Sequence, residues 1–392
     1  MKRIIISAIL LIIITAGFFL IRIGFSSSSF KDLSQGMQYL VSDLVRKDKS
    51  VRNCVLSVMK GDGSFSWSNA AGIAREDGQV PMTRDTPFHI ASITKLYTAT
   101  IIMRLYEKGA LCLDDPMSRY LPEGLIRGIH VYKGKDYSQE ITIKQLLSHT
   151  SGIADYYTEK PKGGKSVFEL LLEKPERIWR EDETIEWARD QLKPNFRPGT
   201  DASYSDTNFD LLGKIIEAIT GQPRHTVYED FIFRPLGLTH TWLIESSAPQ
   251  IPIPPADVFY KNRNIRNIRS NGAYWPYMVS TAEEMIIFLK ALNEGRIVSR
   301  DMLKLMHNWH KLEFPLQNGF GTMYFKLSPL MTRITKMSPL WGHSGSTGSF
   351  LYYSQDQDLY LAGTIDQVDS KIKPFMLMMK VLKLYNQNEA AR

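Results

Sequence analysis

Residues 87–116 read PFHIASITKLYTATIIMRLYEKGALCLDDP, an apolar segment with a serine and a lysine near its start. The pattern predicts a helix that begins near Ser92 and ends before Gly109, because glycine suits the left-handed conformation that follows many helices. Ser92 and Lys95 are three residues apart, so both side chains fall on one face of the first turn. A serine hydroxyl becomes a nucleophile when a nearby base takes its proton, and a neutral lysine can do so. We therefore expect the chemistry at the start of this helix.

The Ser-x-x-Lys spacing is not specific by itself, since it also occurs at Ser57 and Lys60. Its value comes from further segments that follow in order. They are ITIKQLLSHTSGI at 141–153, FRPGTDASYSDTNFDLLGKIIEAITG at 196–221, VSTAEEM at 279–285 and WGHSGSTGSF at 341–350. Together these segments resemble the serine β-lactamase and DD-peptidase superfamily, in particular the branch of class C β-lactamases, serine DD-carboxypeptidases and related esterases. The resemblance covers about residues 45–370.

Strand-like segments lie towards both ends of the chain and helical segments lie between them. Strands are expected at 52–60, 64–73, 340–345, 349–353 and 359–364, and flanking helices at 30–47 and 369–386. One antiparallel sheet built from both ends, with helices around it, is an α+β architecture, and the resemblance implies the β-lactamase/transpeptidase-like fold. We expect residues 30–95 and 275–392 to form a sheet lobe, residues 96–274 a helical lobe, and the substrate cleft to lie between the two.

The second motif of the superfamily is Tyr-x-Asn, and Tyr204-Ser205-Asp206 stands in its place. The resemblance implies that the Tyr204 hydroxyl accepts the proton of Ser92 and passes it to the leaving group, with its pKa lowered by the lysine. Tyr260-Lys261-Asn262 matches the three letters better. It lacks the preceding Pro-Gly and the following helix, so we reject it.

Asp206 departs from the usual asparagine and changes the expected chemistry. An amide can both donate and accept hydrogen bonds, whereas an ionised carboxylate only accepts. Asp206 should pair with Lys95 and favour its charged form. This weakens the case for β-lactam side-chain recognition and moves the proton-handling role from Lys95 towards Tyr204.

The third motif is His343-Ser344-Gly345, where β-lactamases have Lys-Thr-Gly and the peptidase and esterase members have His-x-Gly. We expect His343 on an edge strand facing the cleft, where it would orient Tyr204 and attract an anionic or carbonyl group. Ser344 and Gly345 would contact substrate, with the glycine allowing close approach to the backbone. The resemblance implies that the backbone N–H groups of Ser92 and Ser346 form the oxyanion hole.

Two features of the expected cleft walls each allow two interpretations from the sequence. His149 matches the superfamily, and its main expected role is to hold a loop of the wall, with contact to substrate as the alternative. Residues 275–277, Trp-Pro-Tyr, stand where relatives have a Gly-Gly pair. These aromatic side chains would either narrow the pocket or pack within the fold.

The composition is that of a globular protein, with 43% hydrophobic and 23% charged residues among 392. This balance excludes a disordered chain and a polytopic membrane protein. The net charge of +7 is partly concentrated at the amino terminus, where Lys2, Arg3 and Arg22 flank an apolar run. The remaining surplus is small, and no nucleic-acid-binding motif is recognisable.

Residues 4–21 carry no charge, and as a helix they would span about 27 Å, close to the thickness of a bilayer core. We expect residues 1–24 to be a membrane anchor, or else a signal segment, and residues 25–29 to be a linker. The positive flank should stay in the cytoplasm, which places the catalytic part outside it at the cell membrane. If the segment is cleaved, the protein is secreted.

Cys54 and Cys112 are the only cysteines, and they are either bonded to each other or buried as free thiols. No cofactor and no metal is expected. The sequence therefore predicts an extracytoplasmic serine hydrolase that acts through an acyl-enzyme on D-amino-acid peptides or amides, or on esters, including peptidoglycan-derived molecules. The alternatives are a β-lactam-hydrolysing β-lactamase and a sensor that binds penicillin or muropeptide without turnover.

Overall fold

The computed structural model of the chain describes residues 30, 32–177, 179–244, 253–266, 278–313, 316–325, 339–368, 370 and 372–390. The expected anchor at 1–24, the linker at 25–29 and the aromatic segment 275–277 lie outside this part of the chain. Within the described residues, no helix has both the length and the hydrophobicity needed to cross a membrane.

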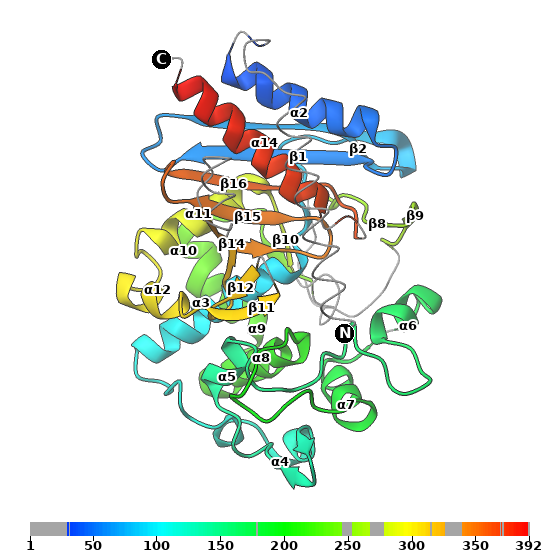
Figure 1. Ribbon diagram of the computed structural model, residues 1–392, viewed down its shortest axis with the longest axis vertical. Helices are drawn as coiled ribbons and strands as arrows, with labels where there is room; N and C mark the ends of the chain where they lie inside the picture. Colours follow the sequence, from blue (N-terminus) through cyan, green and yellow to red (C-terminus); the bar gives the residue numbers. More distant parts are fainter. Residues whose placement is uncertain are drawn as a thin grey trace.

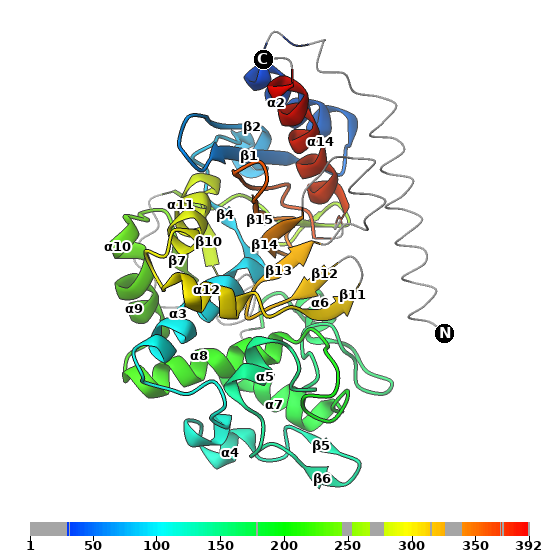
Figure 2. The same cartoon turned by 60° about the vertical axis from the view of Figure 1, so that its left-hand side comes forward.

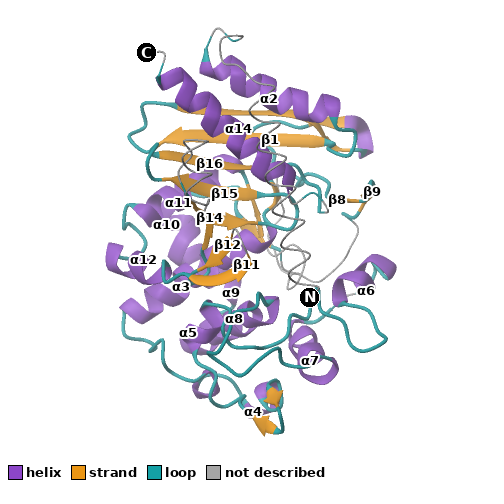
Figure 3. Ribbon diagram, in the orientation of Figure 1, coloured by secondary structure: helices purple, strands orange, loops and turns teal. Residues whose placement is uncertain are grey.

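A nine-stranded sheet forms the centre of the fold, with strand order β11-β12-β13-β14-β15-β16-β1-β2-β3 (Figure 3). The strands are β1 Asn53–Lys60, β2 Ser66–Arg75, β3 Val80–Pro81, β11 His310–Glu313, β12 Leu316–Asn318, β13 Met323–Phe325, β14 Leu340–Ser344, β15 Phe350–Ser354 and β16 Leu359–Thr364. β1 pairs antiparallel with β16, so Val55 lies opposite Thr364. The expected antiparallel sheet, joined from both ends of the chain, is confirmed.

Helices cover both faces of this sheet (Figure 1). α2, Leu33–Lys47, and α14, Ile372–Glu389, pack against each other on one face, and α11, Ala282–Asn293, covers the other. β1 shows the alternation that this arrangement requires: Leu56 lies in the apolar cluster under α2 and α14, while Val55 lies in the cluster under α11. Every residue of β15 and β16 is buried as a result.

The chain between residues 90 and 244 is mainly helical, and its helices between Glu123 and Thr220 lie at the far end of the molecule from α2 and α14 (Figure 2). The remaining helices are α3 Thr94–Glu107, α4 Glu123–Ile126, α5 Ile143–Leu147, α6 Val167–Glu173, α7 Glu181–Gln191, α8 Asp206–Thr220, α9 Arg224–Tyr228, α10 Arg234–Leu236 and α12 Arg300–Met306, with a π-helical turn at Glu229–Phe233. The short strands are β4 Phe88–His89, β5 Val131–Tyr132, β6 Lys135–Asp136, β7 Trp242–Leu243, β8 Phe259–Tyr260, β9 Arg263–Asn264 and β10 Met278–Ser280. α8 packs on α3, α5 and α7, which makes it the centre of this helical group.

The helix expected from Ser92 starts two residues later than predicted. Ser92 lies in a 3-10 turn at Ala91–Ile93, and the regular helix α3 follows from Thr94 to Glu107. Gly109 has φ +71°, as a residue that ends a helix in this way should. Both cysteines are free thiols, with Cys54 buried and Cys112 exposed.

Candidate active site

Ser92 is presented to solvent by a sharp turn between a strand and a helix. The turn follows β4 and places Ala91 at φ +48°, a conformation that L-residues other than glycine seldom adopt. Such backbone strain is often found at functional sites. Ala91 and Ser92 both line a cleft with a volume of about 480 Å³.

Lys95 lies directly behind Ser92, on the first turn of α3. Its Nζ donates to Ser92 Oγ at 3.4 Å and forms a salt bridge with the carboxylate of Asp206. The lysine side chain is 2% exposed and that of Asp206 is 9% exposed. Burial alone would favour the neutral amine, but the negative charge of Asp206 outweighs it and raises the pKa of Lys95 above its usual value. The lysine is therefore an ammonium ion in the resting site.

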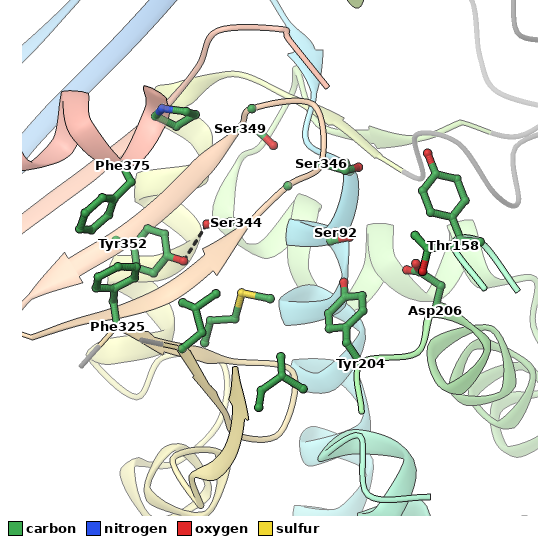
Figure 4. Close-up of a pocket in the computed structure, with 18 of the residues that line it drawn as sticks. Ser92, Thr158, Tyr204, Asp206, Phe325, Ser344, Ser346, Ser349, Tyr352 and Phe375 are labelled. Atoms are coloured by element: carbon green, nitrogen blue, oxygen red, sulfur yellow. Dashed lines mark hydrogen bonds between the residues drawn. The ribbon is translucent and has the colours of Figure 1, made fainter. Parts of the chain in front are cut away.

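Tyr204 enters the cleft from the loop before α8, with its hydroxyl directed towards Ser92 (Figure 4). That hydroxyl is buried beside Ser92 and Lys95, and both of these side chains stabilise its ionised form. Burial raises the pKa of Tyr204 to about 12, although the charge of Lys95 lowers it. The lysine lowers the pKa as expected, but loss of hydration outweighs this single nearby cation, so the net shift is upward. The resting phenol keeps its proton.

His149 holds the loop that carries Tyr204. The imidazole stacks on the phenol ring with centroids 4.5 Å apart, and its Nδ1 accepts a hydrogen bond from the Ser205 N–H at 3.1 Å. Burial, and then the charge of Lys95, keeps the pKa of His149 well below its ordinary value, so the ring is neutral and can accept. His149 is not among the residues that line the cleft.

Asp155 is a site residue that the sequence reasoning missed. It lines the cleft, and its Oδ1 accepts a hydrogen bond from the Asp206 N–H at 3.0 Å. Burial, and then the charge of Asp206, raises the pKa of Asp155 above its usual range. Asp155 lies two residues beyond the matched segment 141–153, and only the fold brings it beside Asp206.

The turn between β14 and β15 supplies the opposite wall of the cleft. Ser344, Gly345 and Ser346 all line it. The backbone N–H of Ser346 and that of Ser92 donate to no other described residue. Two such free donors beside a nucleophile are what an oxyanion hole requires.

Two hydrogen bonds fasten this turn to the strand that leads to the nucleophile. Thr347 Oγ1 donates to His89 O at 2.7 Å, and Ser349 Oγ donates to Ile90 O at 2.9 Å. A Cβ on Gly345 would lie 2.4 Å from Ile90 O, so only glycine permits this approach. The turn that carries Ser92 and the turn that carries Ser346 are thereby held in a fixed relation.

His343 differs from its expected placement. β14 pairs with both β13 and β15 and is not an edge strand, because three further strands extend the sheet beyond it. The imidazole is 1% exposed, does not line the cleft, and its Nδ1 lies 2.8 Å from Ser344 O. Burial and the charge of Lys95 lower the pKa of His343 to about 3, so the ring is neutral.

The predicted residues therefore form two layers. Six line the cleft directly, namely Ser92, Tyr204, Asp206, Ser344, Gly345 and Ser346, whereas Lys95 and His343 lie behind its wall. The rejected Tyr260 lies in the β8–β9 hairpin, packs against Phe168 and does not line the cleft. Across the part of the chain that the structure describes, no three His, Cys, Asp or Glu side chains come together as metal ligands.

Comparison with known proteins agrees with this geometry, since the Beta-lactamase family model matches residues 42–371. The chain belongs to the beta-lactamase family. Esterase EstB of Burkholderia gladioli, a family relative, is 30% identical over 204 residues, which is 52% of this chain and 50% of EstB. D-alanyl-D-alanine-carboxypeptidase/endopeptidase AmpH of Escherichia coli K12 is 31% identical over 54% of this chain and 52% of AmpH. The chain thus spans about half the length of the curated relatives it matches.

Solved structures resemble the chain over more of its length. A D-stereospecific amidohydrolase from Streptomyces sp. is 28% identical with a TM-score of 0.67, covering 89% of this chain and 97% of that protein. D-amino acid amidase from Ochrobactrum anthropi SV3 is 25% identical with a TM-score of 0.69, covering 90% and 99%. The named relatives of this beta-lactamase family member are thus hydrolases of esters, amides and D-alanyl peptides.

Proposed function

We propose that the chain is a serine hydrolase that cleaves amides or peptides of D-amino acids, or esters, through an acyl-enzyme at Ser92. The observation that carries the proposal is the contact between Ser92 Oγ and the Lys95 ammonium in a cleft that also receives the Tyr204 hydroxyl. The names of the related amidohydrolase, amidase and esterase point in the same direction.

The protonation states favour a proton relay through Tyr204. In the resting site Lys95 is charged and Tyr204 is protonated, so neither is a free base. As Ser92 Oγ bonds to the substrate carbonyl carbon, its proton passes to the phenol oxygen, and the phenol proton passes to the leaving nitrogen or oxygen. The bond to that leaving group then breaks. Lys95 stabilises the negative charge that develops on these oxygens.

Water reverses the same path in the second half of the reaction. Its oxygen bonds to the acyl carbon, one of its protons goes to Tyr204, and Tyr204 returns a proton to Ser92 Oγ as the ester bond breaks. The N–H groups of Ser92 and Ser346 hold the carbonyl oxygen in both halves. Removal of one such donor typically costs about 10²–10³ in rate.

A panel of substrates tests the reaction class. The full-length protein, purified in detergent, would be offered nitrocefin, a D-Ala-D-Ala peptide, a D-amino-acid amide and nitrophenyl acetate. We expect turnover of at least one of the amide, the peptide and the acetate, and none by the Ser92→Ala variant. Efficient nitrocefin turnover would favour a β-lactamase, and one equivalent of product without turnover would favour a sensor.

We further propose that residues 4–21 anchor the protein in the cell membrane with its catalytic part outside the cytoplasm. The support is the uncharged run and its basic flanks. A carboxy-terminally tagged protein should then sediment with membranes at full mass. A soluble product that begins near residue 25 would show cleavage instead.

A further inference from the structure

The cleft that contains Ser92 continues into an apolar extension. We call this the apolar arm, and it is formed by side chains of β11, β12, β13 and α14, among them Leu312, Leu316, Met323, Phe325, Phe375 and Met378. Figure 4 shows Phe325, Tyr352 and Phe375 on one side of Ser92, with Thr158 and Asp206 on the other. The cleft is thus apolar on one side of the nucleophile and polar on the other.

The apolar arm is held in shape by contacts among its own side chains. Phe325 and Phe375 stack with ring centroids 4.1 Å apart, which joins β13 to α14. At the boundary with the polar part, Ser344 Oγ and Tyr352 OH are hydrogen-bonded at 2.7 Å. That bond satisfies the phenol, so Tyr352 presents mainly its ring to the arm. A pre-formed apolar cavity binds an apolar group without a large ordering cost.

The charges of the cleft argue against an anionic substrate. Its described lining contains no lysine or arginine side chain, and its two acids are Asp206 and Asp155, of which Asp155 keeps its proton up to near neutral pH. The ammonium of Lys95 lies behind the wall and is paired with Asp206. A carboxylate moved from water into the apolar arm would lose its hydration and meet no lysine or arginine side chain among the described residues that line it.

We propose that the apolar arm binds an aliphatic or aromatic group attached to the scissile ester or amide, and that the substrate carries no carboxylate at that end. The proposal rests on the proposed function and narrows it to neutral, apolar esters and amides. Peptides with a terminal carboxylate should therefore be poor substrates. The same holds for β-lactams, whose carboxylate lies next to the reacting group.

Two ester series test the proposal. One contains nitrophenyl esters from acetate to octanoate, and the other contains acetates of alcohols from methanol to octanol. We expect kcat/KM to rise about threefold per added methylene in the series whose chain enters the arm, until the arm is full. If kcat/KM does not change with chain length in either series, the proposal is overturned. If Ser92-dependent hydrolysis is absent altogether, the proposed function itself fails.

A charge placed in the apolar arm should act on long substrates selectively. Leu316 is half-buried, so Leu316→Asp should fold. In the series whose chain enters the arm, we expect this variant to lower the ratio of kcat/KM for the eight-carbon ester to kcat/KM for the two-carbon ester at least tenfold. The matched control is Leu305→Asp, because Leu305 is a 40% exposed leucine on α12 outside the cleft. An unchanged ratio in the Leu316 variant, or an equal fall in both variants, would refute the assignment.

A matched pair of substrates tests the exclusion of carboxylates. Nitrophenyl hexanoate and mono-nitrophenyl adipate differ mainly in a terminal carboxylate, as do hexyl acetate and 6-acetoxyhexanoate. In the series whose kcat/KM rises with chain length, we expect kcat/KM for the neutral ester to be at least tenfold higher than for its carboxylate partner. Leu316→Lys should narrow this preference by supplying the missing cation. Equal turnover of both esters by the unaltered protein would contradict the proposal.

Discussion

The carboxylate of Asp206 accepts a hydrogen bond from the buried ammonium of Lys95, one turn of helix away from the serine hydroxyl. An asparagine at this position would leave the lysine amine to be neutralised by burial and free to act as a base. The aspartate holds it charged instead. The proposed mechanism therefore assigns proton transfer to Tyr204 and a purely electrostatic role to Lys95.

The substitution Asp206→Asn should change the pH dependence of the reaction. Burial lowers the pKa of Lys95, and loss of the Asp206 charge removes the strongest effect that opposes it, so the pKa falls. We expect the profile of kcat/KM against pH to show the inflection that reports Lys95 at a lower pH in the variant than in the unaltered protein. Hydrolysis of nitrophenyl acetate from pH 5 to 10 measures this. Superimposable profiles would show that Asp206 does not control the charge of Lys95.

Tyr204→Phe should remove the relay and preserve the fold. The phenylalanine ring retains the stacking on His149, whereas the proton path from Ser92 to the leaving group is lost. We expect kcat to fall about 10²–10⁴-fold, the range for loss of a general acid–base group. The melting temperature should change little. A near-normal kcat in this variant would show that a residue other than Tyr204 transfers the proton.

Gly345→Ala should separate the two halves of the oxyanion hole. The added Cβ would lie 2.0 Å from Ser349 Oγ and 2.4 Å from Ile90 O, so the turn that carries Ser346 must move. We expect kcat to fall at least tenfold, with a smaller change in KM. Gly124→Ala is the matched control, because a Cβ on Gly124 meets no atom within 4 Å. Equal kinetics in the two variants would contradict this account.

Asp155→Asn should alter how stability depends on pH. The pKa of Asp155 is raised in the folded protein, so between pH 4 and neutrality the folded state holds a proton that the unfolded state has released. This group therefore makes the protein less stable as pH rises through that interval. The free energy of unfolding should fall less from pH 5 to 7.5 in the variant, as measured by urea denaturation. If the free energy of unfolding changes equally with pH in both proteins, a group other than Asp155 causes the change.

The sequence predicted the central sheet and the order of the motifs because those strands are long and apolar and the motif segments are distinctive. It placed His343 on an edge strand because β11, β12 and β13 have only three or four residues each, too few to show an alternating pattern. The apolar arm was not predictable for a different reason. Leu312 and Phe375 look like ordinary core residues in the sequence, and only the fold brings their distant segments to one side of Ser92.

Covalent labelling of Ser92 tests the central claim most directly. The full-length protein would be treated with a fluorophosphonate probe, its intact mass measured and the modified peptide mapped. We expect one adduct per chain, located at Ser92, with none on the Ser92→Ala variant and slower labelling of Tyr204→Phe. An adduct on any other residue, or labelling that survives in Ser92→Ala, would contradict the assignment of Ser92 as the nucleophile.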